Sequence, residues 1–118
     1  MENMKSIEEN VLIYVSAWNE TEREEIRKKI DECWSAEGTF TDKVTDTITG
    51  RDAIIDLIVS SYKQTGPKNF NLLAQPVTHH RSGHYRWMNL PAEGYPAEGM
   101  DYFEFDEQNL ITRIVGFF

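Results

Sequence analysis

The 118 residues of this chain are the usual length of one domain, so a single domain over 1–118 is predicted. Hydrophobic residues make up 40% of the chain and charged residues 27%, a globular composition rather than a disordered one. The net charge of −8 opposes binding to phosphate backbones and anionic lipids. Nucleic acids and membrane surfaces are therefore not expected as partners.

The N-terminal segment shows no targeting signal. Residues 1–10 contain no apolar run and no cleavage-site pattern, and no apolar stretch approaches the roughly 18 residues of a membrane span. Cys33 is the only cysteine, so no intrachain disulfide can form and the residue is expected to be buried as a small hydrophobic side chain. A cytoplasmic location is expected.

Two helices and a short strand are predicted first. Ser6 and Glu9 form the pattern of a capping box, and apolar residues at helical spacing continue the helix to Trp18. A second capping pattern opens a helix over 21–38, which a glycine ends. The strand is expected over 39–42.

A third helix and four strands complete the predicted order. Thr49 and Asp52 are expected to cap the helix, and Gly66 with the proline after it to end it. Strands rich in aromatic and β-branched residues are predicted over 70–80, 84–90, 100–106 and 110–118. The order ααβαββββ predicts an α+β architecture with the helices on one face of a bent sheet.

Residues 91–99 repeat the tetrapeptide Pro-Ala-Glu-Gly on either side of Tyr95. Two prolines and two glycines oppose strand continuation, so a hairpin loop is predicted over the whole segment. Either the loop is a plain connector, or it forms a rim over a pocket with Tyr95 as its contact.

A trial register for the central hairpin pairs Leu90 with Met100. Arg86 then lies opposite Glu104 on one face, as a favourable cross-strand ion pair. The other face presents Tyr85, Trp87, Asn89, Asp101, Phe103 and Phe105.

Asp101 is the most informative residue of that face. A carboxylate on an apolar face costs several kcal/mol unless it is protonated or hydrogen-bonded. Desolvation predicts a raised pKa for Asp101. The alternative is a structural carboxylate that is satisfied by Asn89, which lies opposite in this register, or by a backbone amide.

The other face of the sheet is partly apolar, with Met88, Met100, Tyr102 and, given a tight last hairpin, Val115. Three helices cannot cover both sides of a five-stranded sheet. An uncovered, partly apolar face predicts a homodimer through this outer surface.

At five segments the chain resembles the nuclear transport factor 2-like superfamily, in its SnoaL-like and ketosteroid-isomerase-like branch. These segments are Tyr14–Asn19, Trp34–Asp42, Gly50–Ile54, Gly99–Asp106 and Ile114–Phe118. The resemblance covers nearly the whole chain and implies a cystatin-like cone, with three helices on a strongly curved, antiparallel-rich sheet. Because this fold carries many activities, the likeness is specific for fold and not for function.

The ketosteroid isomerases imply a set of catalytic residues: Tyr14, Asp42 and Asp101 match their tyrosine, base and protonated aspartic acid. Such chemistry uses a carboxylate to move a proton from carbon and two neutral donors to hold the enolate oxygen. Alternatively, Tyr14 packs the helix and Asp42 is a strand-end residue bonded to its own loop. Trp34 and Ile58 replace further tyrosines of those enzymes, so steroid isomerisation itself is not predicted.

Two functions remain open. One is an isomerase-, cyclase- or dehydratase-type enzyme acting on an apolar carbonyl compound, with Asp42 and Asp101 exchanging protons and no cofactor. The other is a non-catalytic module that binds a small apolar molecule or dimerises. The residues expected to line the site are Trp18, Trp34, Trp87, Asn89, Phe103 and His80. Two carboxyls converging on one point would favour the enzyme, and carboxyls separated by packed tryptophans the binder.

The histidines do not predict a metal site. His79 and His80 are neighbours on a predicted strand and would point to opposite faces. No HExxH or CxxC motif is present. His80 is instead expected to face the cavity beside Tyr85, as a secondary acid–base candidate.

Overall fold

The computed structural model describes residues 4–118, so the first three residues of the segment in which no targeting signal is expected lie outside it. The helices are α1 (Ile7–Ala17), α2 (Arg23–Cys33) and α3 (Arg51–Thr65). The strands are β1 (Trp34–Thr41), β2 (Ile48–Thr49), β3 (Phe70–Leu72), β4 (Val77–His79), β5 (Ser82–Asn89), β6 (Ala97–Phe105) and β7 (Ile111–Phe117).

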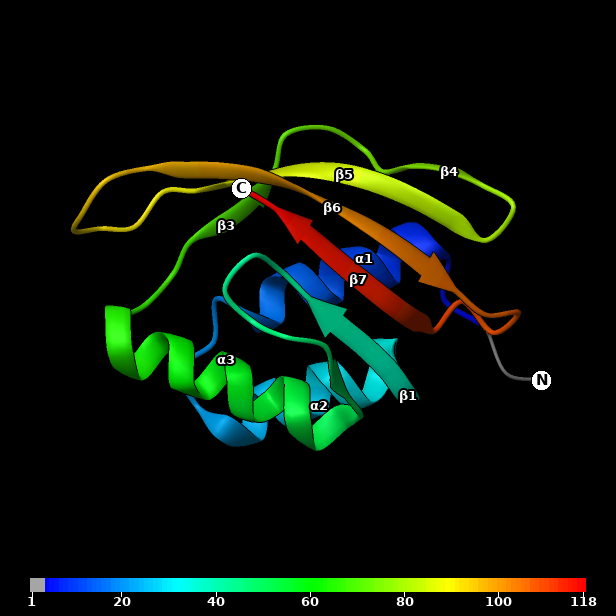
Figure 1. Cartoon of the computed structure of the whole chain (residues 1–118), viewed down its shortest axis with the longest axis horizontal. Helices are drawn as coiled ribbons and strands as arrows, with labels where there is room; N and C mark the ends of the chain where they lie inside the picture. The colour runs from blue at the N-terminus through cyan, green and yellow to red at the C-terminus, as the bar shows by residue number, and fades with distance from the viewer. Residues whose placement is uncertain (1–3) are drawn as a thin grey trace.

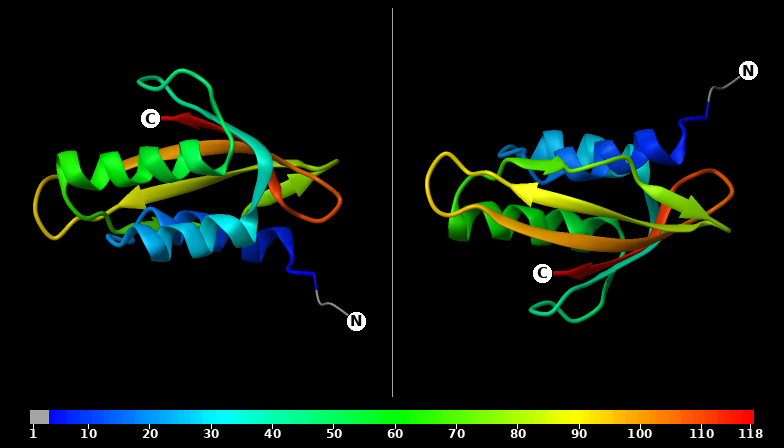
Figure 2. Two further views of the ribbon diagram at one scale, coloured as in Figure 1. Left: turned by 90° about the horizontal axis from the view of Figure 1, so that it is seen from below. Right: turned by 90° about the horizontal axis from the view of Figure 1, so that it is seen from above.

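The strands form one bent sheet, and the helices cover one of its faces (Figures 1 and 2). The strand order is β2-β1-β7-β6-β5-β3, with β4 also paired to β5. All pairs are antiparallel except β1 with β7, which are parallel. The predicted α+β class, with three helices on a curved, antiparallel-rich sheet, is confirmed.

The start of α1 is as predicted. Ser6 accepts a hydrogen bond from the backbone of Glu9, and the Glu9 side chain accepts one from the backbone of Ser6. This reciprocal pair satisfies two backbone donors that the first turn leaves free. Asn10 is buried and donates from Nδ2 to the carbonyl of Asn109 at 2.7 Å, which fixes α1 to the turn between β6 and β7.

The second helix is shorter than predicted. It ends at Cys33, and Trp34 begins β1, so Gly38 lies inside a strand rather than after a helix. The Trp34 ring is fully buried and stacks on Tyr14 of α1, with ring centroids 5.3 Å apart. Burial of this ring in the core favours the extended backbone over another helical turn. The expected capping box at Thr21 is also wrong, because the N-cap is Glu22 without a side-chain cap bond.

Three other predicted boundaries differ. The N-cap of α3 is Gly50, with φ 97°, and not Thr49, which belongs to β2. The predicted strand over 70–80 is two short strands, β3 and β4. The predicted loop over 91–99 is wrong in its second half, because β6 already begins at Ala97 despite the glycine two residues later.

The β5–β6 register differs from the expected one by four residues. Met100 pairs with Arg86 rather than Leu90, and Asp101 pairs with Tyr85 rather than Asn89. The loop between β5 and β6 is shorter than expected, so each residue of β6 pairs with an earlier residue of β5 than predicted. Since side chains alternate with period two, an even shift leaves every residue on its predicted face.

The expected ion pair between Arg86 and Glu104 is therefore absent. Arg86 instead contacts Glu98 at 3.0 Å, and Glu104 contacts Arg113 at 3.5 Å. These pairs are exposed and contribute little to stability.

The core lies between the helices and the concave face of the sheet. Its fully buried side chains come from all three helices and from the long strands, and include Ile26, Ile54, Tyr85, Phe103 and Ile114. Cys33 is buried as predicted, and burial raises the pKa of its thiol to about 12. No helix within residues 4–118 is both long enough and apolar enough to cross a membrane.

Replacing Gly38 with alanine should destabilise the fold. A methyl group there would collide with the buried Trp34 indole, a ring that cannot move away without disturbing Tyr14. Overpacking of this kind costs about 1–3 kcal/mol. Urea unfolding should show this loss for Gly38→Ala, whereas Glu37→Ala, exposed on the same strand, should change stability by less than about 0.5 kcal/mol. Equal stability of both variants would contradict the close packing of Gly38 against the Trp34 indole.

Candidate functional site

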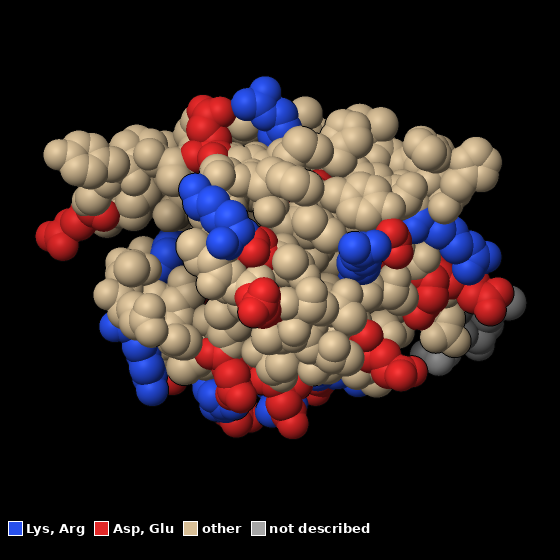
Figure 3. Space-filling model, viewed as in Figure 1, with Lys and Arg blue, Asp and Glu red and all other residues tan. Residues whose placement is uncertain are grey.

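A cavity of about 600 Å³ lies between α1, α3 and the concave side of the sheet, within the size range of small-molecule sites. On the surface the molecule is hollowed between the tip of the β5–β6 hairpin and the C-terminal end of α3, at the left of Figure 3. Of the predicted site residues, six line this cavity: Tyr14, Trp18, Asp42, Trp87, Asn89 and Asp101.

Asp101 is held on β6 by two side chains of β5. The Tyr85 hydroxyl donates to Oδ2 at 2.6 Å, and the Trp87 indole donates from Nε1 to Oδ1 at 3.2 Å. Tyr85 is the direct cross-strand partner of Asp101, and Trp87 is the next residue on the same face. The proposed structural partner, Asn89, does not contact Asp101 and instead accepts from the backbone of Asn69.

Burial raises the pKa of Asp101 to about 6 from an ordinary value of 3.8. The hydrogen bonds from Tyr85 and Trp87 stabilise the charged form and limit this rise, while the negative charge of Asp42 adds to it. The prediction of a raised pKa is thus in agreement with the structure. A carboxyl of this kind changes protonation close to neutral pH.

Asp42 follows β1 and lies in a tight turn. Its Oδ1 accepts from the backbone amides of Val44 at 2.9 Å and Thr45 at 2.8 Å. These two bonds fix the carboxylate, as the strand-end alternative expected. Oδ2 accepts no hydrogen bond from any other described residue, and Asp42 also lines the cavity.

Gly116 of β7 lies between Asp101 and Asp42. It pairs with Asp101 across the β6–β7 ladder. A methyl group on Gly116 would lie 3.2 Å from Asp101 Oδ1 and 3.4 Å from Asp42 Cβ. Because glycine has no side chain, Asp101 and the Cβ atom of Asp42 can both pack closely against it, one on each side, where all three residues line the cavity. We call this part of the cavity wall the Gly116 gap.

Tyr14 reaches the same cavity from α1. It is 2% exposed, and burial together with the charge of Asp101 raises its pKa well above 10, against a smaller lowering by the Trp18 indole. The phenol therefore stays protonated at neutral pH. Its hydroxyl donates no hydrogen bond to another described residue, so its proton is available to a molecule in the cavity.

Five aromatic rings form a continuous wall, which we call the aromatic arc: Phe40, Trp18, Phe70, Trp87 and Phe118. Neighbouring ring centroids along it are 5.9, 6.2, 5.2 and 6.1 Å apart. The side chain of Asn19 exchanges two hydrogen bonds with the backbone of Phe70, which holds β3 against the end of α1.

The facing wall is the polar side of α3. Ser60, Ser61, Gln64 and Thr65 line the cavity there. Lys68 also lines it, but its Nζ donates to Thr65 Oγ1 at 2.6 Å and to the Gly66 carbonyl at 2.8 Å. Lys68 thus neutralises the carbonyl end of the helix.

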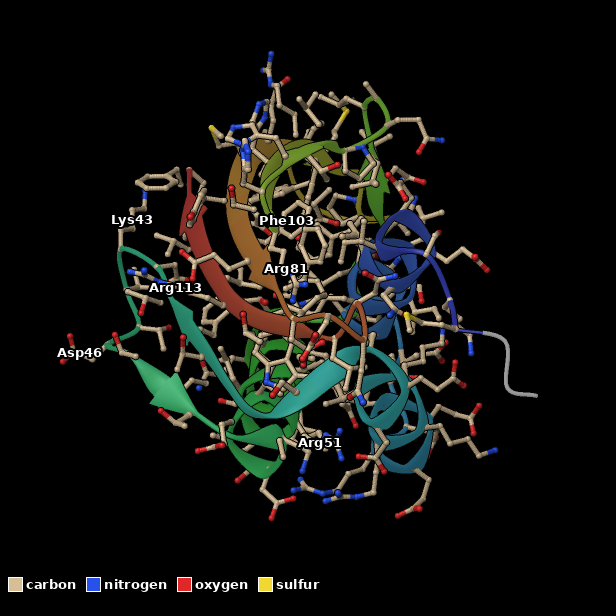
Figure 4. The ribbon with its side chains drawn as sticks, turned by 90° about the vertical axis from the view of Figure 1, so that its right-hand side faces the viewer. Lys43, Asp46, Arg51, Arg81, Phe103 and Arg113 are labelled. Atoms are coloured by element: carbon tan, nitrogen blue, oxygen red, sulfur yellow. The ribbon has the colours of Figure 1, made fainter. Side chains whose placement is uncertain are left out.

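Three predicted site residues do not line the cavity. Trp34 and Phe103 are fully buried in the core, and Figure 4 shows Phe103 between the sheet and α1. His80 is exposed in the turn between β4 and β5, at φ 47°. Tyr95 is 93% exposed and makes no contact with the cavity.

The turn also changes the histidine geometry. His79 and His80 do not point to opposite faces, because the positive φ of His80 brings their Nδ1 atoms to 3.1 Å. Within residues 4–118 there is no group of three or more His, Cys, Asp or Glu side chains arranged to hold a metal ion.

Three further features of the site are not predicted from the sequence: Gly116, Phe118 and the role of Tyr85. Tyr85 lies on its predicted face, but its pairing with Asp101 depends on a register that differs from the expected one. Gly116 carries no local signal, since only the neighbours brought to it by β1 and β6 give it importance.

No known protein-family profile and no curated protein matches the sequence. Solved structures do match. A candidate isomerase of the SnoaL-like family from Agrobacterium tumefaciens is 22% identical, with a TM-score of 0.83 over 92% of this chain and 93% of that chain. An NTF2-like protein of unknown function from an Exiguobacterium species is 16% identical, with a TM-score of 0.73 over 92% and 96%.

A third is a protein with a ketosteroid isomerase-like fold from Catenulispora acidiphila, solved with trimethylamine. It is 15% identical, with a TM-score of 0.74 over 93% of this chain and 85% of that chain. This chain therefore has the cone-like fold shared by SnoaL-like, NTF2-like, ketosteroid isomerase-like and cystatin-fold proteins, as the resemblance implied.

The titration of Asp101 should be visible in stability. The unfolded carboxyl ionises near pH 3.8 and the folded one near 6, so between these values only the folded chain keeps the proton. The stability of the wild type relative to Asp101→Asn should therefore fall by about 2 kcal/mol from pH 4 to pH 7. Urea unfolding at each pH measures this difference.

The variant Tyr85→Phe is a control that keeps the Asp101 carboxyl and changes its pKa. It removes a hydrogen bond to the charged form, so the pKa of Asp101 should rise further, as observed by NMR of the side-chain carboxyl carbon. An ordinary pKa near 4 in the wild type would remove Asp101 from the site.

Proposed function

We propose that the cavity is the active site of an acid–base enzyme that moves a proton on a small apolar carbonyl compound, as isomerases, cyclases and dehydratases do. The observation that carries this proposal is that Asp42 and Asp101 both border the Gly116 gap. Two carboxyl side chains that line one cavity on either side of Gly116 can act on one bound molecule. Had tryptophans packed between them, binding alone would have been the better interpretation.

The roles follow from the state of each group. Asp42, with one oxygen free of described partners, removes a proton from a carbon next to the carbonyl group. Tyr14 and protonated Asp101 donate hydrogen bonds to the carbonyl oxygen, whose negative charge grows as the enolate forms. The proton on Asp42 then returns to the same molecule at another carbon, or leaves with a departing group.

The pKa of Asp101 suits this work. A group with a pKa of about 6 can both hold and release a proton near neutral pH, which is the condition for efficient proton transfer. The aromatic arc removes apolar parts of the substrate from water, and the hydroxyl and amide groups of α3 remain for its polar parts. Trp18, Trp87 and Asn89 are substrate-contacting residues in this proposal.

A second candidate is binding without turnover. The aromatic arc favours it, because five rings provide a large apolar contact whatever the carboxylates do. The Catenulispora acidiphila protein was solved in complex with trimethylamine, which supports the idea that a chain of this fold can bind a small molecule.

Proton exchange at carbon separates these two candidates. In D₂O the protein should accelerate deuterium uptake next to the carbonyl of 1-indanone or 2-tetralone, followed by NMR. Asp42→Asn should slow this at least about 100-fold, the usual contribution of a general base. Asp46→Asn, in the same loop but directed away from the molecule in Figure 4, should not change it.

Gly116→Ala tests the gap itself. The φ angle of Gly116 lies outside the left-handed region, so alanine meets no backbone strain, but its methyl group would crowd Asp101 Oδ1. Exchange should slow more than tenfold while the fold is kept. Binding of the ketone, seen as quenching of tryptophan fluorescence, without any accelerated exchange would favour the binder.

We also propose that the chain forms a homodimer through the outer face of the sheet. Met88, Met100, Tyr102 and Val115 lie there half-buried, and no helix of the described residues covers them. The exposed pairs Arg86–Glu98 and Arg113–Glu104 border this apolar strip with both charges. An isologous interface can match each charge to its opposite in the second copy.

Sedimentation velocity at a protein concentration of about 50 μM should show a dimer, since specific dimers persist at micromolar concentrations. Met100→Glu places a charge in the strip and should give a monomer with unchanged helix content. Lys28→Glu, on α2 at the opposite side of the molecule, is the control and should leave the dimer intact. A wild type that stays monomeric would exclude this interface.

A further inference from the structure

The cavity combines aromatic rings with negative charge. The faces of the five rings of the aromatic arc carry partial negative charge, which attracts cations. Asp42 and Asp101 border the same cavity, and Asp101 is mostly ionised above pH 6. The whole chain adds a net charge of −8. Along the lower edge of Figure 3, Asp and Glu alternate with Lys and Arg.

Among the described residues that line the cavity, Lys68 is the only Lys or Arg. Its ammonium donates hydrogen bonds to Ser61, Thr65 and Gly66 at the end of α3, so it is held there by the protein's own groups. The two carboxylates of the lining outnumber this single positive charge.

The molecule itself already places a cation on the aromatic arc. The ammonium of Lys43 lies over the ring of Phe118, 4.6 Å from its centroid. Figure 4 shows Lys43 on the loop after β1, beside the end of β7. Lys43 does not line the cavity, so it occupies Phe118 from outside and leaves the inner rings uncovered.

We propose that the aromatic arc is a subsite for a small alkylammonium cation, which is either the ligand or the positively charged end of it. This inference rests on the proposal that the cavity holds a small molecule, and not on proton transfer. Ring faces hold the methyl groups of such a cation, while Asp101 and Asp42 balance its charge at short range.

A neutral molecule of the same shape would meet the same apolar surface. Choline and 3,3-dimethyl-1-butanol differ only in the charge of the central atom, so they isolate the contribution of charge. Choline should bind at least about tenfold more tightly than the alcohol, as measured by calorimetry or by quenching of tryptophan fluorescence. Equal affinities would overturn the inference.

The pH dependence of choline binding shows whether the negative charge of Asp101 strengthens it. As pH rises from 5 to 7, Asp101 loses its proton and choline should bind more tightly, whereas the alcohol should not respond. Three other titratable groups near Asp101 do not change over this range, because the pKa values of Tyr14 and Tyr85 are raised well above 10 and that of Cys33 is about 12. Asp42 also faces Asp101, and its contribution is separated from that of Asp101 by the variant Asp101→Asn. Asp101→Asn should abolish the rise.

Two surface variants test the rings without risk to the core. Phe118→Leu removes the half-exposed last ring of the arc and should weaken choline several-fold, with little change for the alcohol. Lys43→Gln removes the competing cation and should strengthen choline binding, whereas Lys28→Gln, the same charge change on α2, should not.

The choline and ketone experiments test the cation subsite and the proton-transfer proposal separately. If 1-indanone binds and exchanges deuterium while choline does not bind, the cation subsite is wrong and the enzyme proposal stands. If choline binds with the expected pH dependence while no ketone exchanges, the subsite is correct and the protein is a binder of alkylammonium compounds.

Discussion

The buried carboxylate of Asp101 is the constraint on which the rest of the site depends. An ionisable group with 8% of its surface exposed must be hydrogen-bonded, and the sheet provides both donors from one neighbouring strand, Tyr85 and Trp87. These donors occupy one position on each oxygen and leave room for another partner. The carboxyl is therefore hydrogen-bonded within the fold and still borders the cavity.

The strand topology brings the side chains of Asp42 and Asp101 to the same cavity. Asp42 follows β1, which lies parallel to β7, and β7 in turn pairs with the strand that carries Asp101. Gly116 pairs with Asp101 in the β6–β7 ladder and directly follows Val115, the last residue of β7 that pairs with β1. A side chain at this position would crowd Asp101 Oδ1 and Asp42 Cβ.

The same cavity has walls of two kinds. The aromatic arc is apolar but electrostatically negative at the ring faces, and α3 presents hydroxyl and amide groups. Such a cavity favours a ligand with an apolar or methylated part and a separate polar part. The solved structures with this fold share its backbone at 15–22% identity, so the chemistry depends on these side chains and not on the fold.

The sequence by itself determined the fold class, the first helix with its capping box, and the face on which each residue of β5 and β6 lies. These features depend on local periodicity, which an even error in register does not disturb. It also identified Asp101, because a carboxylate on an apolar face is conspicuous. Only the tertiary structure decided that Trp34 starts a strand, that Tyr85 is the partner of Asp101, and that Gly116 lies between Asp101 and Asp42. Each of these features results from contacts between segments that are far apart in the chain, and local propensity contains no information about such contacts.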